Sequence, residues 1–226
     1  MTTLVNVARY HLVDRLSYVA MPWGIMAFSF LVNVAIAALA PGPHYTGGVL
    51  TIYVFLLICG VLSMTRMLPL GLMLGVSRRG YYLGTALLVA VLGIGYGLGL
   101  TMLQALERAT GGWGLKLHFF RVPWILDGPW YQTWLTSAVV LMLFFLYGMW
   151  YGLVFRRWSL PGLIAFIAAQ VLVALAVVAA VTLSHSWSGV GSFFVTLTAP
   201  ALVGVLAVVV AVLGLGGLTT MRRVTL

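Results

Sequence analysis

Side chains able to carry acid–base, nucleophilic or metal chemistry are scarce in this chain. Its histidines form no HExxH pattern and lie near the ends of apolar runs or between them: His11, His44, His118 and His185. A catalytic nucleophile needs a base within hydrogen-bond reach, and the stretch SHSWSGVGS around His185 is typical of a polar turn. The only cysteine, Cys59, excludes an intramolecular disulfide and a cysteine metal cluster. We therefore predict no enzyme activity and no metal site, and no GxxxxGK[ST] sequence is present to bind ATP.

Three neutral polar side chains, Asn33, Gln104 and Gln170, interrupt the apolar runs. Polar residues inside a membrane are candidates for function by default, so these three are the candidate substrate-binding residues. A hydrogen bond between helices is the favoured alternative for each. The three acidic residues all fall at the ends of apolar runs. This placement argues against an ion-coupled transporter and against a channel with a charged filter.

Composition defines the elements that must position these side chains. The 226 residues are 63% hydrophobic and 7% charged, and the mean hydropathy is +1.13. Soluble domains carry about 25% charged residues, so the chain is predicted to be an all-α integral membrane protein. A helical span needs roughly 20 apolar residues. We predict one transmembrane domain over residues 1–226, with six spans at 21–40, 48–70, 84–104, 132–153, 160–183 and 200–218.

The cationic residues predict the orientation of these spans. Three of them, Arg108, Lys116 and Arg121, belong to one side, and nine of the twelve belong to the other: Arg9, Arg15, Arg66, Arg78, Arg79, Arg156, Arg157, Arg222 and Arg223. Lysine and arginine accumulate on the cytoplasmic side, so both termini are expected inside the cell, in the cytoplasmic (inner) membrane. The net charge of +9 then reflects orientation and contact with the anionic lipid bilayer. Nucleic-acid binding is not expected, since no basic soluble module is present.

Four further segments have predicted roles. Leu4, Ala8, Leu12 and Leu16 recur at four-residue spacing, so residues 1–17 are predicted to form an amphipathic helix on the inner leaflet; a frayed tail is the alternative. In GIGYGLGL, Gly93/Gly97 and Gly95/Gly99 are small-xxx-small pairs typical of close helix packing. The aromatic outer segment 107–132 is expected to be an interfacial cap, and residues 191–200 a short re-entrant helix.

The most distinctive stretch is LPLGLMLGVSRRGYYLGT, residues 68–85. Gly75 is able to end a helix and Ser77 to cap a new short turn. That turn is predicted to display two guanidinium groups and two phenol rings, which are side chains typical of binding hot spots. The alternative is that the two arginines only follow the positive-inside rule, with side chains that extend to the membrane surface and bind no partner.

This stretch resembles a motif close to A-LG-x-[ST]-R-[RK]-x-[FY]-[FY]-LG-T in permease subunits of bacterial ABC transporters of the type-two exporter fold. The resemblance implies that the turn is a coupling helix seated in a separate ATPase subunit, which binds ATP and Mg. The coupling residues are then Ser77, Arg78, Arg79, Gly80, Tyr81 and Tyr82, with secondary contacts from Arg9, Arg15, Arg156 and Arg157. It further implies a second permease copy or paralogue.

Two departures from that family are visible. Gly80 stands where members often carry a polar or acidic residue, and the longest outer segment follows span three instead of span five. The resemblance implies export, and the nearly uncharged spans favour an amphiphilic or apolar substrate. A different class remains open: a substrate-capturing membrane subunit of a vitamin uptake system, or a scaffold that transports nothing.

Overall fold

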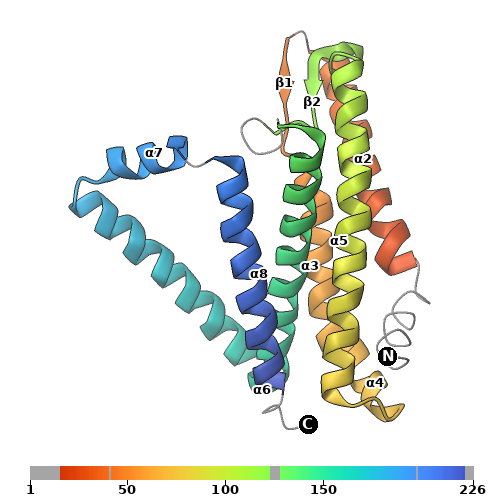
Figure 1. Ribbon diagram of the computed structural model, residues 1–226, viewed down its shortest axis with the longest axis vertical. Coiled ribbons are helices and arrows are strands. Elements are labelled where there is room, and N and C mark those ends of the chain that lie inside the picture. The colour runs from red at the N-terminus through yellow and green to blue at the C-terminus, as the bar shows by residue number, and fades with distance from the viewer. Residues whose placement is uncertain (1–15, 41, 123–127, 197, 222–226) are drawn as a thin grey trace.

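The computed structural model describes residues 16–40, 42–122, 128–196 and 198–221 (Figure 1). In chain order the elements are η1 Leu16–Ala20, α2 Met21–Leu39, β1 His44–Tyr45, α3 Leu50–Leu62, η2 Ser63–Met67, α4 Leu68–Met73, α5 Arg78–Ala109, η3 Gly112–Lys116, β2 Leu117–His118, α6 Trp130–Leu183, α7 Trp187–Thr196 and α8 Ala199–Met221. The predicted all-α class is confirmed, with the addition of one short parallel ladder that pairs β1 with β2.

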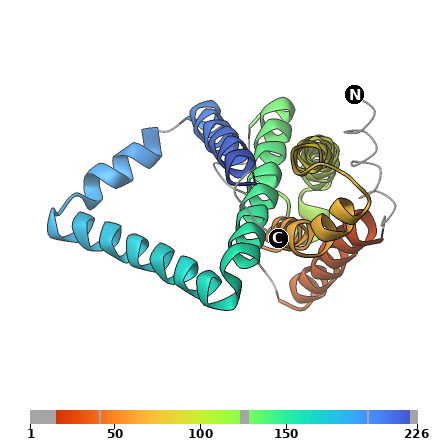
Figure 2. The same cartoon turned by 90° about the horizontal axis from the view of Figure 1, so that it is seen from below.

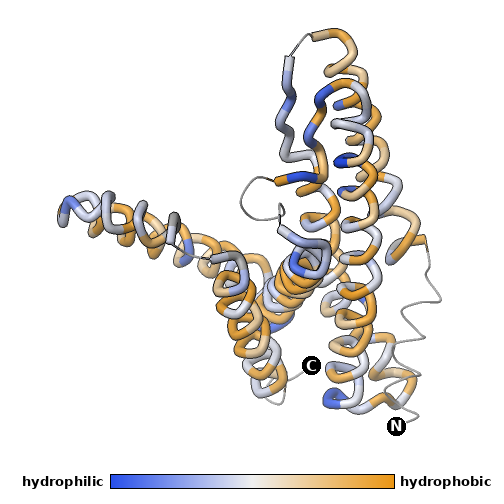
Figure 3. Tube along the Cα trace, turned by 45° about the horizontal axis from the view of Figure 1, so that its top comes forward, coloured by the Kyte–Doolittle hydropathy of each residue, from blue (hydrophilic) through white to orange (hydrophobic). Residues whose placement is uncertain are grey.

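Within these ranges, five helical segments are long and apolar enough to cross a membrane: Tyr18–Leu39, Leu50–Met73, Arg78–Ala109, Trp130–Leu183 and Pro200–Met221. Hydrophobic residues run along all of these helices, as Figure 3 shows. This is the pattern expected of a membrane protein. The predicted amphipathic helix at 1–17 lies almost wholly outside the described residues, and so do Arg9 and Arg15.

Helix α6 contains two of the predicted spans, 132–153 and 160–183. Its 54 residues would measure about 80 Å if straight, against a hydrocarbon core of about 30 Å. The backbone instead leaves helical geometry at Ser159, with φ 54° and ψ −156°, two residues before Pro161. We call this point the α6 bend. The second part of α6 then runs back toward the other end of the molecule (Figure 1).

The first part of α6, residues 130–158, is the centre of the bundle. It packs against α3, α5 and α8, and Figure 2 shows α8 on one side of it and α3 with α5 on the other. The closest approach is to α3. A Cβ added to Gly148 would overlap the carbonyl oxygen of Leu57, and one added to Gly60 would overlap that of Phe145. Only glycine permits such contact between helix backbones.

The predicted glycine packing in α5 is half confirmed. A Cβ on Gly93 would lie 3.1 Å from the Ala138 carbonyl, and one on Gly97 3.0 Å from the Trp134 carbonyl, so this pair does admit α6. Gly99 instead meets the ring of Trp23 in α2. Gly95 has nothing within 4 Å of the same position. Gly95/Gly99 therefore does not act as a pair that admits a second helix backbone; only Gly99 contacts another helix, through the Trp23 side chain.

The second part of α6 and α7 extend away from the bundle before α8 returns to it (Figures 1 and 2). Nearly all of the described side chains of 160–196 are exposed or half-buried. A re-entrant helix must be enclosed by protein, because its ends carry unpaired backbone groups. The predicted helix at 191–200 is therefore misplaced: the helix is α7, it begins at Trp187, and the surrounding chain does not enclose it.

Candidate functional site

The chain turns between α4 and α5 by two local hydrogen-bond motifs that were both predicted. Gly75 adopts φ +80°, its N–H donates to Leu72 O at 3.0 Å, and the Val76 N–H donates to Gly71 O at 3.0 Å. These two bonds end α4 as a Schellman motif. Ser77 then caps α5, because its Oγ accepts the Gly80 N–H at 3.1 Å. The turn is short and its backbone is held at both ends.

The predicted display of aromatic rings on this turn is wrong. Arg78 starts the 32-residue helix α5 directly, so no separate short helix forms at 77–82. Tyr81 is 0% exposed and Tyr82 is 3% exposed. The Tyr81 hydroxyl donates to Ser63 O at 2.6 Å and the Tyr82 hydroxyl to Gly214 O at 2.8 Å. The helical phase turns both rings inward, where they join η2 and α8 to α5.

The arginines of the turn remain at the surface. Arg79 is exposed and Arg78 is half-buried. They are the first two residues of α5, and its first turn has no acidic residue. A helix N-terminus carries partial positive charge and disfavours cations by about 0.3–1 kcal/mol each. The helix macrodipole therefore does not explain the exposed Arg79.

A second basic segment, Arg156 and Arg157, lies immediately before the α6 bend. Figure 1 shows this bend and the α4–α5 turn at the same end of the molecule. Arg156 Nη1 donates to Thr65 O at 3.5 Å, a long hydrogen bond. The residue four positions after Thr65 is Pro69, which has no N–H to donate to the Thr65 carbonyl. Arg157 stacks 4.8 Å above the Trp158 ring. We call this region, which includes Arg66 of η2, the basic end.

The three polar candidates inside the helices have different surroundings. The Asn33 amide donates to Ser29 O at 2.8 Å within its own helix, so the described residues do not form the expected bond between helices here. Gln104 is buried, and its Nε2 has no hydrogen-bond partner in the described part of the chain. Gln170 Oε1 accepts the hydroxyl protons of Tyr147 at 2.5 Å and Tyr151 at 2.8 Å. Gln170 thus joins the two parts of α6, as the favoured alternative predicted.

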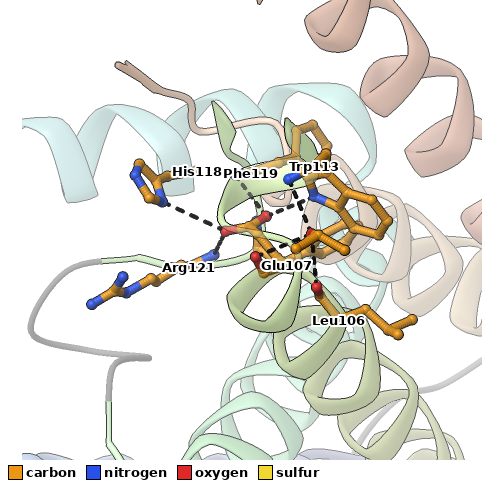
Figure 4. A network of polar contacts seen from close by, with 8 residues as sticks. Leu106, Glu107, Trp113, His118, Phe119 and Arg121 are labelled. Carbon is orange, nitrogen blue, oxygen red and sulfur yellow. Dashed lines mark hydrogen bonds and ion pairs between the residues drawn. The ribbon is translucent and has the colours of Figure 1, made fainter. Parts of the chain in front are cut away.

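The opposite end holds a buried carboxylate, although in the sequence all three acidic residues fall at the ends of apolar runs (Figure 4). Glu107 is 1% exposed. Its Oε2 accepts the backbone N–H groups of Phe119 at 3.0 Å and Phe120 at 2.9 Å, and the Trp113 indole N–H at 3.3 Å. Its Oε1 accepts the Arg121 backbone N–H at 3.1 Å. His118 Nδ1 lies 4.0 Å from the same oxygen.

Aromatic rings close over this carboxylate. Phe30 of α2 packs edge-on against Trp113 at 5.0 Å and Phe119 at 5.3 Å between ring centroids, and Tyr45 of β1 stacks on His118 at 4.7 Å. We call this assembly of α2, β1, η3 and β2 around Glu107 the Glu107 cap. It is a packed structural cap, consistent with the predicted role of segment 107–132; residues 123–127 of that segment are outside the described ranges.

No protein-family model, no curated protein and no solved structure matches this chain. Function is therefore inferred from the geometry of the basic end and of the helices behind it.

Proposed function

We propose that the chain is the membrane-spanning subunit of an ATP-driven transporter of the ABC type-two exporter class. A separate ATPase subunit docks on the basic end, and a second copy or a paralogue of the chain completes the pathway. The observation that carries this proposal is Arg79, exposed at a helix start where the helix macrodipole opposes it. A residue that breaks a local rule of stability without local compensation marks a functional position.

The geometry of the basic end supports a docked partner. The Schellman motif and the Ser77 cap hold the α4–α5 turn, and Arg156 links the second basic segment to η2. Exposed arginine on rigid backbone is favoured at binding hot spots because little order is lost on binding. Arg79, Arg78 and Arg157 are the proposed contacts, with the buried Tyr81 and Tyr82 holding the turn in place behind them.

The proposed topology has six crossings, with the basic end in the cytoplasm. The α6 bend supports this count because it divides a 54-residue helix into two parts that are each long enough to span about 30 Å. The positive-inside rule supports the orientation. Both termini then lie on the side of the basic end. The crossing helices contain few charged residues, which supports an apolar or amphiphilic cargo.

The Arg79→Glu variant tests the docking proposal. Glutamate in the first turn favours the macrodipole by about 0.3–1 kcal/mol, so thermal unfolding of the purified chain should be unchanged or slightly raised. Loss of an arginine hot spot of about 2 kcal/mol weakens an interface roughly thirtyfold. We expect an ATPase to co-purify with the wild-type chain from host membranes, with vanadate-sensitive hydrolysis, and to be lost from the variant.

The matched control is Lys116→Glu, which makes the same charge change at an exposed residue of the Glu107 cap. It should retain the ATPase. Equal recovery of the ATPase with wild type and Arg79→Glu would refute docking at this turn. A tightly bound vitamin with no ATPase would favour the substrate-capturing class instead.

An Arg79→Cys variant tests sidedness. Cys59 is 2% exposed, so a membrane-impermeant maleimide should modify only the introduced thiol. We expect labelling in inverted membrane vesicles and not in intact cells; an Arg108→Cys variant at the far end of α5 should show the reverse. Labelling of residue 79 in intact cells would contradict the proposed orientation.

A further inference from the structure

Two phenols and one amide gather where the two parts of α6 diverge. Tyr147 and Tyr151 lie on the first part and Gln170 on the second, and the phenol rings pack edge-on with centroids 5.0 Å apart. Both hydroxyls donate to Gln170 Oε1. We call these three residues the phenol–amide cluster. Gln170 lies about 15 Å along the helix from the start of the second part of α6, which is half the thickness of a hydrocarbon core of about 30 Å.

The cluster has hydrogen-bond donors left over. A glutamine side chain offers one acceptor oxygen and two N–H donors. Its oxygen accepts both phenol protons, whereas its Nε2 donates to no acceptor among the described residues. Donors without acceptors are costly in hydrocarbon. Gln170 is only half-buried, and the neighbouring Val171, Leu172 and Val173 are exposed, so a molecule in the bilayer can reach this amide.

An apolar pocket begins at the same phenol. Its volume is about 400 Å³, and Tyr147 lines it together with Leu57, Leu143, Phe144, Val209 and Leu213. Ligand pockets are typically about 300–1,000 Å³, mostly apolar, with a few polar groups that fix orientation. The lining has no charged residue, and a charge buried there would lack the partner it requires.

We propose that the phenol–amide cluster and this pocket form an intramembrane binding site for a neutral amphiphile. The apolar body occupies the pocket, and a neutral oxygen acceptor, such as a hydroxyl or carbonyl, accepts the Gln170 N–H. A bilayer phospholipid in its ordinary position keeps its polar oxygens at the edge of the hydrocarbon core, away from Gln170. If the chain is the proposed transporter, this site defines the chemical class of its cargo. Only the claim that the bound molecule is transported rests on the proposed function.

The test uses the purified chain in phosphatidylcholine nanodiscs with two photoreactive probes. One is a C16 fatty alcohol bearing a diazirine and an alkyne, and the other is the matched alkane without the hydroxyl. A hydrogen bond between membrane groups is worth about 0.6–1.7 kcal/mol. Labelling of the pocket peptides should therefore favour the alcohol roughly 3- to 20-fold.

Four variants separate the parts of the site. Gln170→Leu should bring the alcohol-to-alkane ratio to about one, whereas Tyr151→Phe, which leaves the amide in place, should retain the preference. Leu213→Trp should fill the pocket and reduce labelling by both probes. The matched control Ile58→Trp fills a different apolar pocket of about 430 Å³ beside α2 and should change neither. Thermal unfolding of each variant confirms that it is folded.

Several outcomes would overturn the site: equal labelling of the wild-type chain by both probes, an unchanged ratio in Gln170→Leu, or labelling in detergent micelles that disappears in nanodiscs. The last result would identify bilayer phospholipid as the occupant. No ATPase is present in this assay. Selective binding therefore stands if the ATPase proposal fails, and a docked ATPase stands if selectivity is absent.

Discussion

Replacing Glu107 with alanine should unfold the Glu107 cap and lower the stability of the whole bundle. Three backbone N–H groups donate to this carboxylate, from Phe119, Phe120 and Arg121. A buried donor left without an acceptor costs about 1–3 kcal/mol, so the loss should be roughly 3 kcal/mol or more. The measurement is thermal unfolding of the purified protein in detergent, followed by circular dichroism.

The isosteric variant Glu107→Gln refines this prediction. Its amide oxygen still accepts, but its NH₂ faces backbone donors, so its stability should fall between that of wild type and Glu107→Ala. The exposed Arg108, whose side chain donates to Gly128 O at 3.2 Å, gives a control: Arg108→Ala should cost about 1 kcal/mol or less. Equal stability of Glu107→Ala and wild type would mean that the carboxylate does not hold the cap.

A single methyl group at Gly148 should separate α3 from α6. The added Cβ would overlap the carbonyl oxygen of Leu57, which is backbone and cannot rotate away. Overpacking of a core costs about 1–3 kcal/mol and sometimes more, and a backbone neighbour places this site at the upper end. We expect Gly148→Ala to lower the unfolding temperature sharply and to broaden the size-exclusion peak.

Gly95→Ala is the control for Gly148→Ala. Gly95 lies inside α5 and has nothing within 4 Å of an added Cβ, so alanine should raise helix stability by up to about 1 kcal/mol. The two variants make the same chemical change with opposite expected signs. An equal effect of both would show that helix propensity, and not the α3–α6 contact, controls the outcome.

Local features of the fold were predictable from the sequence. Gly75 and Ser77 act through hydrogen bonds to residues three to five positions away, so their motifs could be inferred from the sequence. The break near residue 160 was also predictable, since Pro161 lacks an N–H and proline is tolerated only in the first turn of a helix. One residue, Ser159, makes the whole bend between the predicted spans 132–153 and 160–183.

Features that depend on distant partners could not be inferred in the same way. Glu107 binds backbone groups 12 to 14 residues away, and backbone N–H groups leave no trace in composition. Residue type and the resemblance to the permease motif both place Tyr81 and Tyr82 on a partner surface, and neither contains the packing of the helices. Their helical phase, and the carbonyls of Ser63 and Gly214 that receive them, depend on the packing of the bundle.

Helix α5 has a mechanical consequence. It begins with Arg78 and Arg79 at the basic end and runs without interruption for 32 residues, about 48 Å. Glu107 lies in its last turn. The hydrogen bonds at Gly75 and Ser77 leave the α4–α5 turn little freedom to deform when a partner displaces it. A partner that tilts the first turn of α5 therefore moves the whole helix as a rigid body. The last turn of α5 moves with it, together with the Glu107 carboxylate that holds the cap.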